Sequence, residues 1–155
     1  MKSWKQALIN SLLIGKMAGV TTAVAAAVCG QVENGSAIAP INAISHIVHG
    51  DKAAQNHELS LKYTMTGLAL NSAANSIWAA LYEIGFGEAA EQGNVPVSLL
   101  GGAIISSVAY ITDYHLVPPR FTPGFEKHLS SRSLFIIYAV LALSLVIGGL
   151  LRRKK

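Results

Sequence analysis

The sequence predicts an all-α membrane protein: an antiparallel bundle of four transmembrane helices with one short interfacial amphipathic helix. Its 155 residues are 52% hydrophobic and only 13% charged, whereas soluble domains carry about 25% charged residues. So few charges cannot cover a water-facing surface, which excludes an ordinary soluble globule and a disordered chain. The length allows one domain, so we expect residues 1–155 to form a single integral membrane domain.

Charged residues are segregated from the apolar parts of the chain. Four windows are apolar enough to span a membrane, at residues 7–29, 63–85, 97–117 and 133–151. Of the 12 basic and 8 acidic residues, only Lys16, Glu83 and Asp113 lie inside these windows. A helix rises about 1.5 Å per residue, so each window with its flanks can cross a hydrocarbon core of about 30 Å. The fourth window is the most continuously apolar, and the other three carry polar or small-residue stripes that must face other helices.

The first window carries a stripe of small residues. Gly15 and Gly19 lie four positions apart, and alanines continue the stripe. Such stripes let two helix backbones approach closely, so the stripe is expected to pack against another span of the bundle. Contact of Gly15 and Gly19 with a protein partner or a second copy of the chain is a further possibility. In an alternative interpretation, residues 1–25 are a secretory signal that is cleaved at an A-x-A-like site, although Lys16 interrupts the apolar run that such a signal needs.

The second window places amides and a phenol on one face. Asn71, Asn75 and Tyr82 share a side of the predicted helix, which therefore faces either other helices or a ligand. Glu83 lies beside this face, at a depth compatible with Lys16 of the first window. Opposite charges at one depth reduce each other's desolvation cost, so we expect an intramembrane ion pair between Lys16 and Glu83. In the alternative, each side chain reaches the membrane surface alone.

The third window ends in an aspartate that is followed by a proline-rich loop. Asp113 lies at the end of a stripe of small and polar residues, and Arg120 follows directly after two prolines. A charge-assisted bond between Asp113 and Arg120 would hold the loop against the helices. We therefore predict that these two side chains form an outer-loop tether.

A shorter amphipathic helix is predicted at about residues 40–49, between the first two windows. Pro40 suits the first turn of a helix and Gly50 suits its end. Isoleucines line one side, and His46 and His49 line the other, so we expect this helix to lie in the membrane interface. Two histidines three residues apart can bind one metal ion, so a metal site at His46 and His49, or a bound haem, remains an alternative to a protein without a cofactor.

Basic residues near both ends of the chain predict its orientation. Lys2 and Lys5 precede the first window, and four basic residues follow the last, at positions 152–155. The positive-inside tendency places both ends in the cytoplasm, which an even number of spans allows. The net charge of +4 comes largely from the second cluster, and no nucleic-acid-binding module accompanies it. The expected partner of the basic cluster is the lipid bilayer.

Two sequence elements carry a resemblance. Residues 42–46 read N-A-x-S-H, and residues 113–129 read D-Y-H-x-V-P-x-R-x-T-P-G-F-E-x-H-L. Together with the stretch 78–83, these elements resemble a family of small uncharacterised bacterial four-span inner-membrane proteins, over roughly residues 40–150. The resemblance implies a multi-pass protein of the bacterial inner (plasma) membrane. It implies no activity and no catalytic residues.

No motif in the chain points to an enzyme. G-x-S-x-G, H-E-x-x-H, C-x-x-C and a glycine-rich phosphate loop do not occur in the sequence. We therefore expect a small non-enzymatic membrane protein that serves as an accessory or assembly component. One alternative is a small-ligand or ion binding or transport protein that uses the Asn71, Asn75 and Tyr82 face and the outer histidines. Another is a membrane metalloprotein that uses His46 and His49.

Overall fold

The computed structural model describes residues 4–152, and this part of the chain is built from helices without any strand. The predicted all-α class is therefore confirmed. Four of the helices are long: α1 (Trp4–Asn34), α4 (Tyr63–Glu91), α5 (Val95–Ile111) and α6 (Ser131–Leu150). At its end, α5 continues directly into a wider π-helical turn, η1 (Thr112–Leu116).

Three of these helices are long and apolar enough to cross a membrane, namely α1, α5 together with η1, and α6. α4 has sufficient length, with 29 residues. It is less apolar than the other three because it carries two asparagines, several hydroxyl side chains and Glu83. The four-span bundle consequently stays a prediction.

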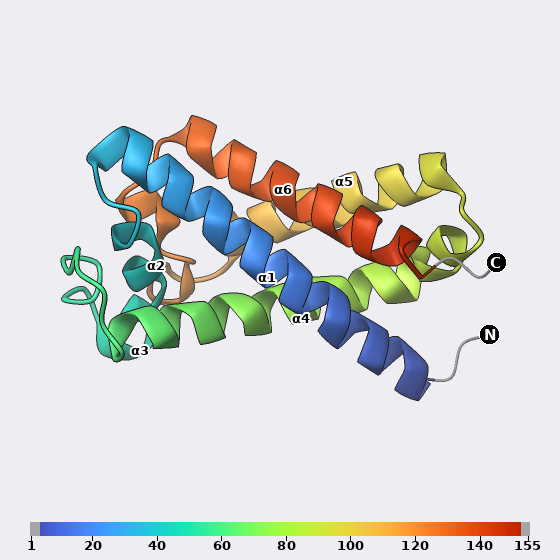
Figure 1. Ribbon diagram of the computed structural model, residues 1–155, viewed down its shortest axis with the longest axis horizontal. Coiled ribbons are helices and arrows are strands. Elements are labelled where there is room, and N and C mark those ends of the chain that lie inside the picture. Colours follow the sequence, from blue (N-terminus) through green and yellow to red (C-terminus); the bar gives the residue numbers. More distant parts are fainter. Residues whose placement is uncertain (1–3, 153–155) are drawn as a thin grey trace.

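The long helices pack side by side and alternate in direction (Figure 1). α1 crosses α4 and packs along α6, and α5 contacts both α6 and α4. The start of α1, the turn between α4 and α5, and the end of α6 lie together at the right of Figure 1. We call this the turn end.

Short helices close the other end of the molecule. We call this part the cap, residues 35–62 and 117–130, and it contains α2 (Ala39–Ile44), α3 (His46–His49), η2 (Pro119–Phe121) and η3 (Phe125–Lys127). Glu33 at the end of α1 joins this helix to the last residue of the cap, since its carboxylate accepts hydrogen bonds from Ser130 N at 2.8 Å and from Ser130 Oγ at 2.6 Å. Ser130 in turn caps the first turn of α6.

The predicted interfacial helix at residues 40–49 is wrong in two respects. The chain forms two short helices joined at Ser45, and the first of them, α2, is fully buried against α4, α1 and η3 instead of lying on a surface. Gly67 of α4 explains the burial, because a β-carbon at this position would overlap the carbonyl oxygen of Ile41. The missing side chain lets α2 rest directly on the backbone of α4.

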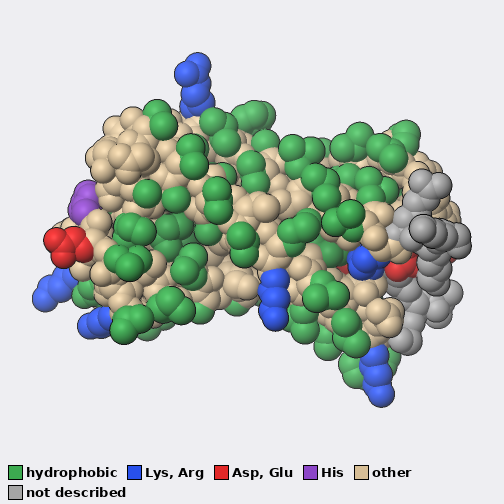
Figure 2. Space-filling view, in the orientation of Figure 1, with side chains coloured by type: hydrophobic (Ala, Val, Ile, Leu, Met, Phe, Trp, Pro, Cys, Tyr) green, Lys and Arg blue, Asp and Glu red, His purple; other side chains and the backbone are tan. Residues whose placement is uncertain are grey.

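The long helices bury many polar side chains and expose many large apolar ones, unlike the helices of a typical soluble protein. The long helices bury polar side chains, which include Asn10, Thr22, Asn71, Asn75, Glu83, Ser98, Ser106 and Ser144. The same helices expose large apolar side chains, which include Leu13, Val24, Ile77, Ile84, Leu100, Ile104, Phe135 and Leu143. Figure 2 shows hydrophobic side chains spread over this face of the molecule, with the visible acidic side chains at its two ends. Lipid favours this arrangement, because it offers no hydrogen-bond partners to outward-facing polar groups.

Candidate functional site

A cavity of about 290 Å³ lies between α4, α6 and the cap. Most of its wall is apolar, with Ile44, Ile47, Leu70, Ile137 and Leu141 among the lining residues. A few polar side chains converge on it from different helices: Thr22, Asn71, Asn75, Asp113 and Tyr138. An apolar hollow with a few convergent polar groups is the usual form of a small-molecule site.

The two predicted asparagines line this cavity and also bind the neighbouring helix. Asn71 Nδ2 donates to Gly19 O of α1 at 2.8 Å and to Thr22 Oγ1 at 3.2 Å. Asn75 Nδ2 donates to Asn71 O at 2.7 Å and to Asn71 Oδ1 at 3.1 Å. Asn75 Oδ1 accepts no hydrogen bond from any residue in the described range 4–152. The amides therefore join α1 to α4 and leave one carbonyl oxygen available at the cavity.

Asp113 contributes a carboxylate to the same cavity. It lies in η1, and Tyr138 of α6 donates a hydrogen bond from its hydroxyl to Asp113 Oδ2 at 2.6 Å. Within residues 4–152, Oδ1 accepts no hydrogen bond and Asp113 forms no ion pair. The wider π-helical turn changes the direction of the side chains that follow α5, and such turns are frequent at functional sites.

The cavity opens beside α4 at the level of the cap. Two of its lining residues are also exposed on the outside, with exposed fractions of 62% for Ile77 and 56% for Phe121. Trp78 lines the wall next to this opening and is half-buried. Part of the cavity wall therefore lies at the surface of the molecule.

Tyr82 does not belong to this cavity. Its side chain is fully buried nearer the turn end, where the hydroxyl donates to Ser98 O of α5 at 3.4 Å. The sequence placed Tyr82 on the same face as Asn71 and Asn75, and that face is buried. Because α4 is long, one end of this face places Asn71 and Asn75 at the cavity and α1, whereas the other end places Tyr82 against α5.

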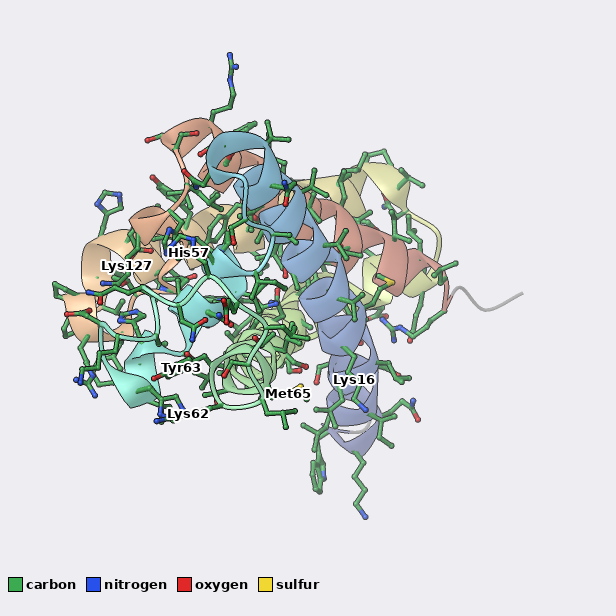
Figure 3. All side chains as sticks on the ribbon, turned by 60° about the vertical axis from the view of Figure 1, so that its left-hand side comes forward. Lys16, His57, Lys62, Tyr63, Met65 and Lys127 are labelled. Atoms are coloured by element: carbon green, nitrogen blue, oxygen red, sulfur yellow. The ribbon has the colours of Figure 1, made fainter. Side chains whose placement is uncertain are left out.

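The predicted ion pair between Lys16 and Glu83 is not formed. Lys16 is exposed on the surface of α1, away from the cap residues His57 and Lys127 that Figure 3 also labels. Glu83 is buried and forms a salt bridge with Arg152, whose Nη2 contacts Oε1 and whose Nη1 lies 3.3 Å from Oε2. Asn10 of α1 also donates to Glu83 Oε2, at 3.3 Å. The buried carboxylate thus has a cationic partner, but from the turn that follows α6 and not from α1.

The predicted tether between Asp113 and Arg120 is also not formed. Arg120 Nε instead donates to the carbonyl oxygen of Ile47 in α3 at 3.2 Å. Asp113 points away from the loop toward Tyr138. Arg120 still fastens the loop, but to α3 and through a backbone carbonyl in place of the carboxylate.

His46 and His49 have separate partners. His46 is buried, and its Nε2 donates to Thr122 O at 2.8 Å. His49 Nε2 shares a hydrogen bond with Thr66 Oγ1 at 3.3 Å, and its ring lies edge-on to Tyr63. Across residues 4–152, no group of three or more His, Cys, Asp and Glu side chains is placed to hold a metal ion. The two imidazoles fasten the cap, and neither lines the cavity.

The small-residue stripe of α1 is covered by α4. A β-carbon on Gly15 would overlap Ser76, and one on Gly19 would lie 3.1 Å from the Cα atom of Ser72. The predicted contact of Gly15 and Gly19 with a separate partner is therefore replaced by a contact within the chain. The close approach also brings the carbonyl of Gly19 within reach of Asn71.

Sequence reasoning missed two residues of these sites. Tyr138 was read only as part of an apolar span, and Arg152 only as part of a basic anchor. A buried phenol usually finds a hydrogen-bond partner, so a tyrosine inside the most apolar window was a usable signal.

Comparisons of the chain with protein-family models, curated proteins and solved structures find no match.

Proposed function

We propose that this chain is a membrane protein that binds a small ligand, and that the cavity between α4, α6 and the cap is its binding site. The observation that carries the proposal is the convergence of Asn75, Asp113 and Tyr138 on an otherwise apolar hollow of about 290 Å³. This volume is at the lower end of the range for ligand pockets. The occupant would be a molecule with one or two polar groups and an apolar body.

The accessory or assembly role expected from the sequence loses its main support. It depended on Gly15 and Gly19 being available to a partner, and α4 occupies that face. Binding is also favoured over transport, because the amide nitrogens of Asn71 and Asn75 are engaged in hydrogen bonds between and within helices. Amides held in this way suit a fixed site better than a continuous water path. We retain a non-enzymatic role.

We further propose that the protein is a member of the family of small bacterial four-span inner-membrane proteins that it resembles. In this proposal α4 crosses the membrane in addition to α1, α5 and α6, and both ends of the chain lie in the cytoplasm. Burial of polar side chains supports a membrane-crossing α4, because Asn71 and Asn75 face α1 while Ile77, Leu81 and Ile84 are exposed. A helix with polar groups turned inward can cross lipid even when its average composition is only moderately apolar. The basic residues at the turn end support the orientation.

Filling the cavity tests the proposed function. Ala74 lines the cavity on α4, whereas Ala69 is exposed on the same helix and does not line it. The test uses purified protein in detergent and three probes of similar size: 2-phenylethylamine, 2-phenylethanol and phenylacetate. We expect at least one probe to bind the wild type and the Ala69→Trp variant but not the Ala74→Trp variant. If no probe binds, or if Ala74→Trp leaves binding intact, the cavity is not a ligand site.

Cysteine labelling tests the topology. In a Cys29→Ser background, single cysteines replace the exposed residues Lys62 in the cap and Gln92 at the turn end. A maleimide that cannot cross the membrane is applied to spheroplasts. We expect Lys62→Cys to react and Gln92→Cys to react only after lysis. Equal labelling of both positions before lysis would show that α4 does not separate the two compartments.

A further inference from the structure

We infer that the ligand of this cavity is an organic cation, a protonated amine carried on a compact apolar body, and that Asp113 supplies the opposing charge. The inference rests on the proposed function, because it names the ligand class of the same cavity. It is carried by the pairing of one carboxylate with an aromatic and aliphatic wall.

Asp113 is a carboxylate without a cationic partner in the part of the chain that the structure describes. Its Oδ2 accepts one hydrogen bond from Tyr138, and Oδ1 accepts none there. An anionic side chain in a membrane-spanning segment is costly unless an opposite charge or a proton neutralises it. A cation bound in the cavity would therefore neutralise the Asp113 carboxylate.

Two basic side chains of the cap loop have partners other than Asp113. Arg120 donates to Ile47 O, and Lys127 forms an ion pair with Asp51 at 3.1 Å. Neither Arg120 nor Lys127 therefore neutralises Asp113, and a bound cation could take that place.

The cavity wall suits the remainder of such a ligand. Trp78, Phe121, Phe125 and Tyr138 place four aromatic rings around the site. Aromatic faces attract cations, most strongly when both are shielded from water. Asn75 of α4 adds an acceptor to the same wall, since its Oδ1 accepts no hydrogen bond from any described residue.

A bare metal ion fits this site poorly. Within residues 4–152, Asp113 does not belong to any group of three or more Asp, Glu, His and Cys side chains that could hold a metal ion. Hard cations require several oxygen ligands, whereas this wall is mainly hydrocarbon. The same wall is a good environment for the carbon skeleton of an amine.

The experiment compares probes that differ only in charge. 2-Phenylethylamine is cationic at pH 7.5, 2-phenylethanol is a neutral analogue of nearly equal size, and phenylacetate is an anion. We expect the amine to bind the detergent-solubilised full chain about tenfold or more tightly than the alcohol, because its charge-assisted bond to Asp113 is stronger. Phenylacetate should be the weakest of the three.

Asp113→Asn is the decisive variant, since it keeps the side-chain shape and the acceptor for Tyr138 but removes the charge. We expect the preference for amine over alcohol to disappear in this variant, while alcohol binding changes little. The wild-type comparison of the three probes stands even if the variant does not fold. Equal binding of amine and alcohol, or a preference that survives Asp113→Asn, would overturn the cation assignment and leave the ligand site itself in place. Binding of none of the probes would overturn both.

Discussion

Gly15 of α1 lies so close to Ser76 of α4 that a β-carbon on the glycine would overlap both the Cα and Oγ atoms of the serine. One turn further along, a β-carbon on Gly19 would lie 3.1 Å from the Cα atom of Ser72, which is a close contact without overlap. The two helices cross at this point (Figure 1). Because the backbones nearly touch, Asn71 of α4 can reach the Gly19 carbonyl, and the polar interior depends on the absence of two side chains.

Gly15→Ala is expected to destabilise the protein by about 1–3 kcal/mol, the usual cost of overpacking a closely packed contact. The added methyl group must push α1 away from α4 and lengthen the hydrogen bonds between them. Thermal or denaturant unfolding in detergent measures the change.

Gly85→Ala is the matched control, because Gly85 lies in α4 and a β-carbon there meets nothing within 4 Å. Alanine is the better helix former by about 1 kcal/mol, so this variant should be as stable as the wild type or more stable. A Gly15→Ala variant that behaved like Gly85→Ala would show that α1 and α4 do not approach closely.

Removal of Arg152 is expected to destabilise the turn end. The Glu83 side chain has no exposed surface, and the Arg152 side chain is 18% exposed. Loss of a partner from a buried ion pair costs about 3–5 kcal/mol, and the partial exposure of Arg152 lowers our expectation for Arg152→Ala to about 2 kcal/mol.

A double-mutant cycle with Glu83→Gln isolates this interaction. Glutamine keeps the shape of Glu83 but needs no cation, so Arg152→Ala should cost much less in the Glu83→Gln background. An equal cost in both backgrounds would assign the effect of Arg152 to its packing and to its second salt bridge, with Glu91 at 3.5 Å. Lys16→Met serves as the control for general loss of charge, since Lys16 is exposed, and it should leave the unfolding midpoint nearly unchanged.

The sequence predicted which face of α4 is buried but not which charge would meet Glu83. Lys16 follows Gly15 directly, and neighbouring residues are about 100° apart around a helix. When Gly15 faces α4, Lys16 must therefore point to the side. Depth along the helix could be read from the sequence, whereas its rotation is fixed only when α1 and α4 come into contact.

The Asp113 site illustrates a second limit. Proximity along the chain suggested Arg120 as the partner, but the π-helical turn and the two prolines that follow separate the side chains. Tyr138 becomes the partner because α5 and α6 pack together, a contact that no local pattern contains. The cavity arises in the same way, since its wall combines residues from six separate parts of the chain.

Asp51 is expected to titrate below the ordinary aspartate value of about 3.9. The hydrogen bond from Lys127 and then its positive charge lower the pKa of the Asp51 carboxyl in the folded protein. A lowered folded pKa stabilises the fold above the ordinary value, and this contribution is lost as the pH falls through the folded pKa. Because Asp51 is largely exposed, the effect on the unfolding midpoint should be small. Carboxyl-carbon NMR measures the pKa directly.

Lys127→Met should return the pKa of Asp51 toward the ordinary value. Lys52→Met is the control, since it removes an adjacent exposed lysine that does not bind Asp51 within the described structure. If both variants shift Asp51 equally, general charge around the cap is responsible and the specific ion pair is not.

Gly124→Ala is expected to disrupt the contact at which the two distinctive sequence elements meet. Gly124 belongs to the T-P-G-F stretch and has a φ of 89°. A β-carbon there would lie 2.5 Å from the carbonyl oxygen of Ala43 in the N-A-x-S-H element. His46 of that element joins the same stretch by its hydrogen bond to Thr122 O. The two elements are thus distant in sequence but form one packed core of the cap.

Gly35→Ala separates the two penalties of this substitution. Gly35 also has a positive φ, of 68°, but a β-carbon there meets nothing within 4 Å. Gly35→Ala should therefore lower the free energy of unfolding only by the cost of a left-handed backbone, about 1–2 kcal/mol. Gly124→Ala should lose about 3 kcal/mol or more, because overlap with Ala43 adds to that cost. Unfolding midpoints in detergent compare the two variants, and equal losses would mean that α2 does not pack on Gly124. Since Phe121 and Phe125 flank Gly124 and line the cavity, Gly124→Ala should also weaken binding of 2-phenylethylamine, whereas Gly35→Ala should not.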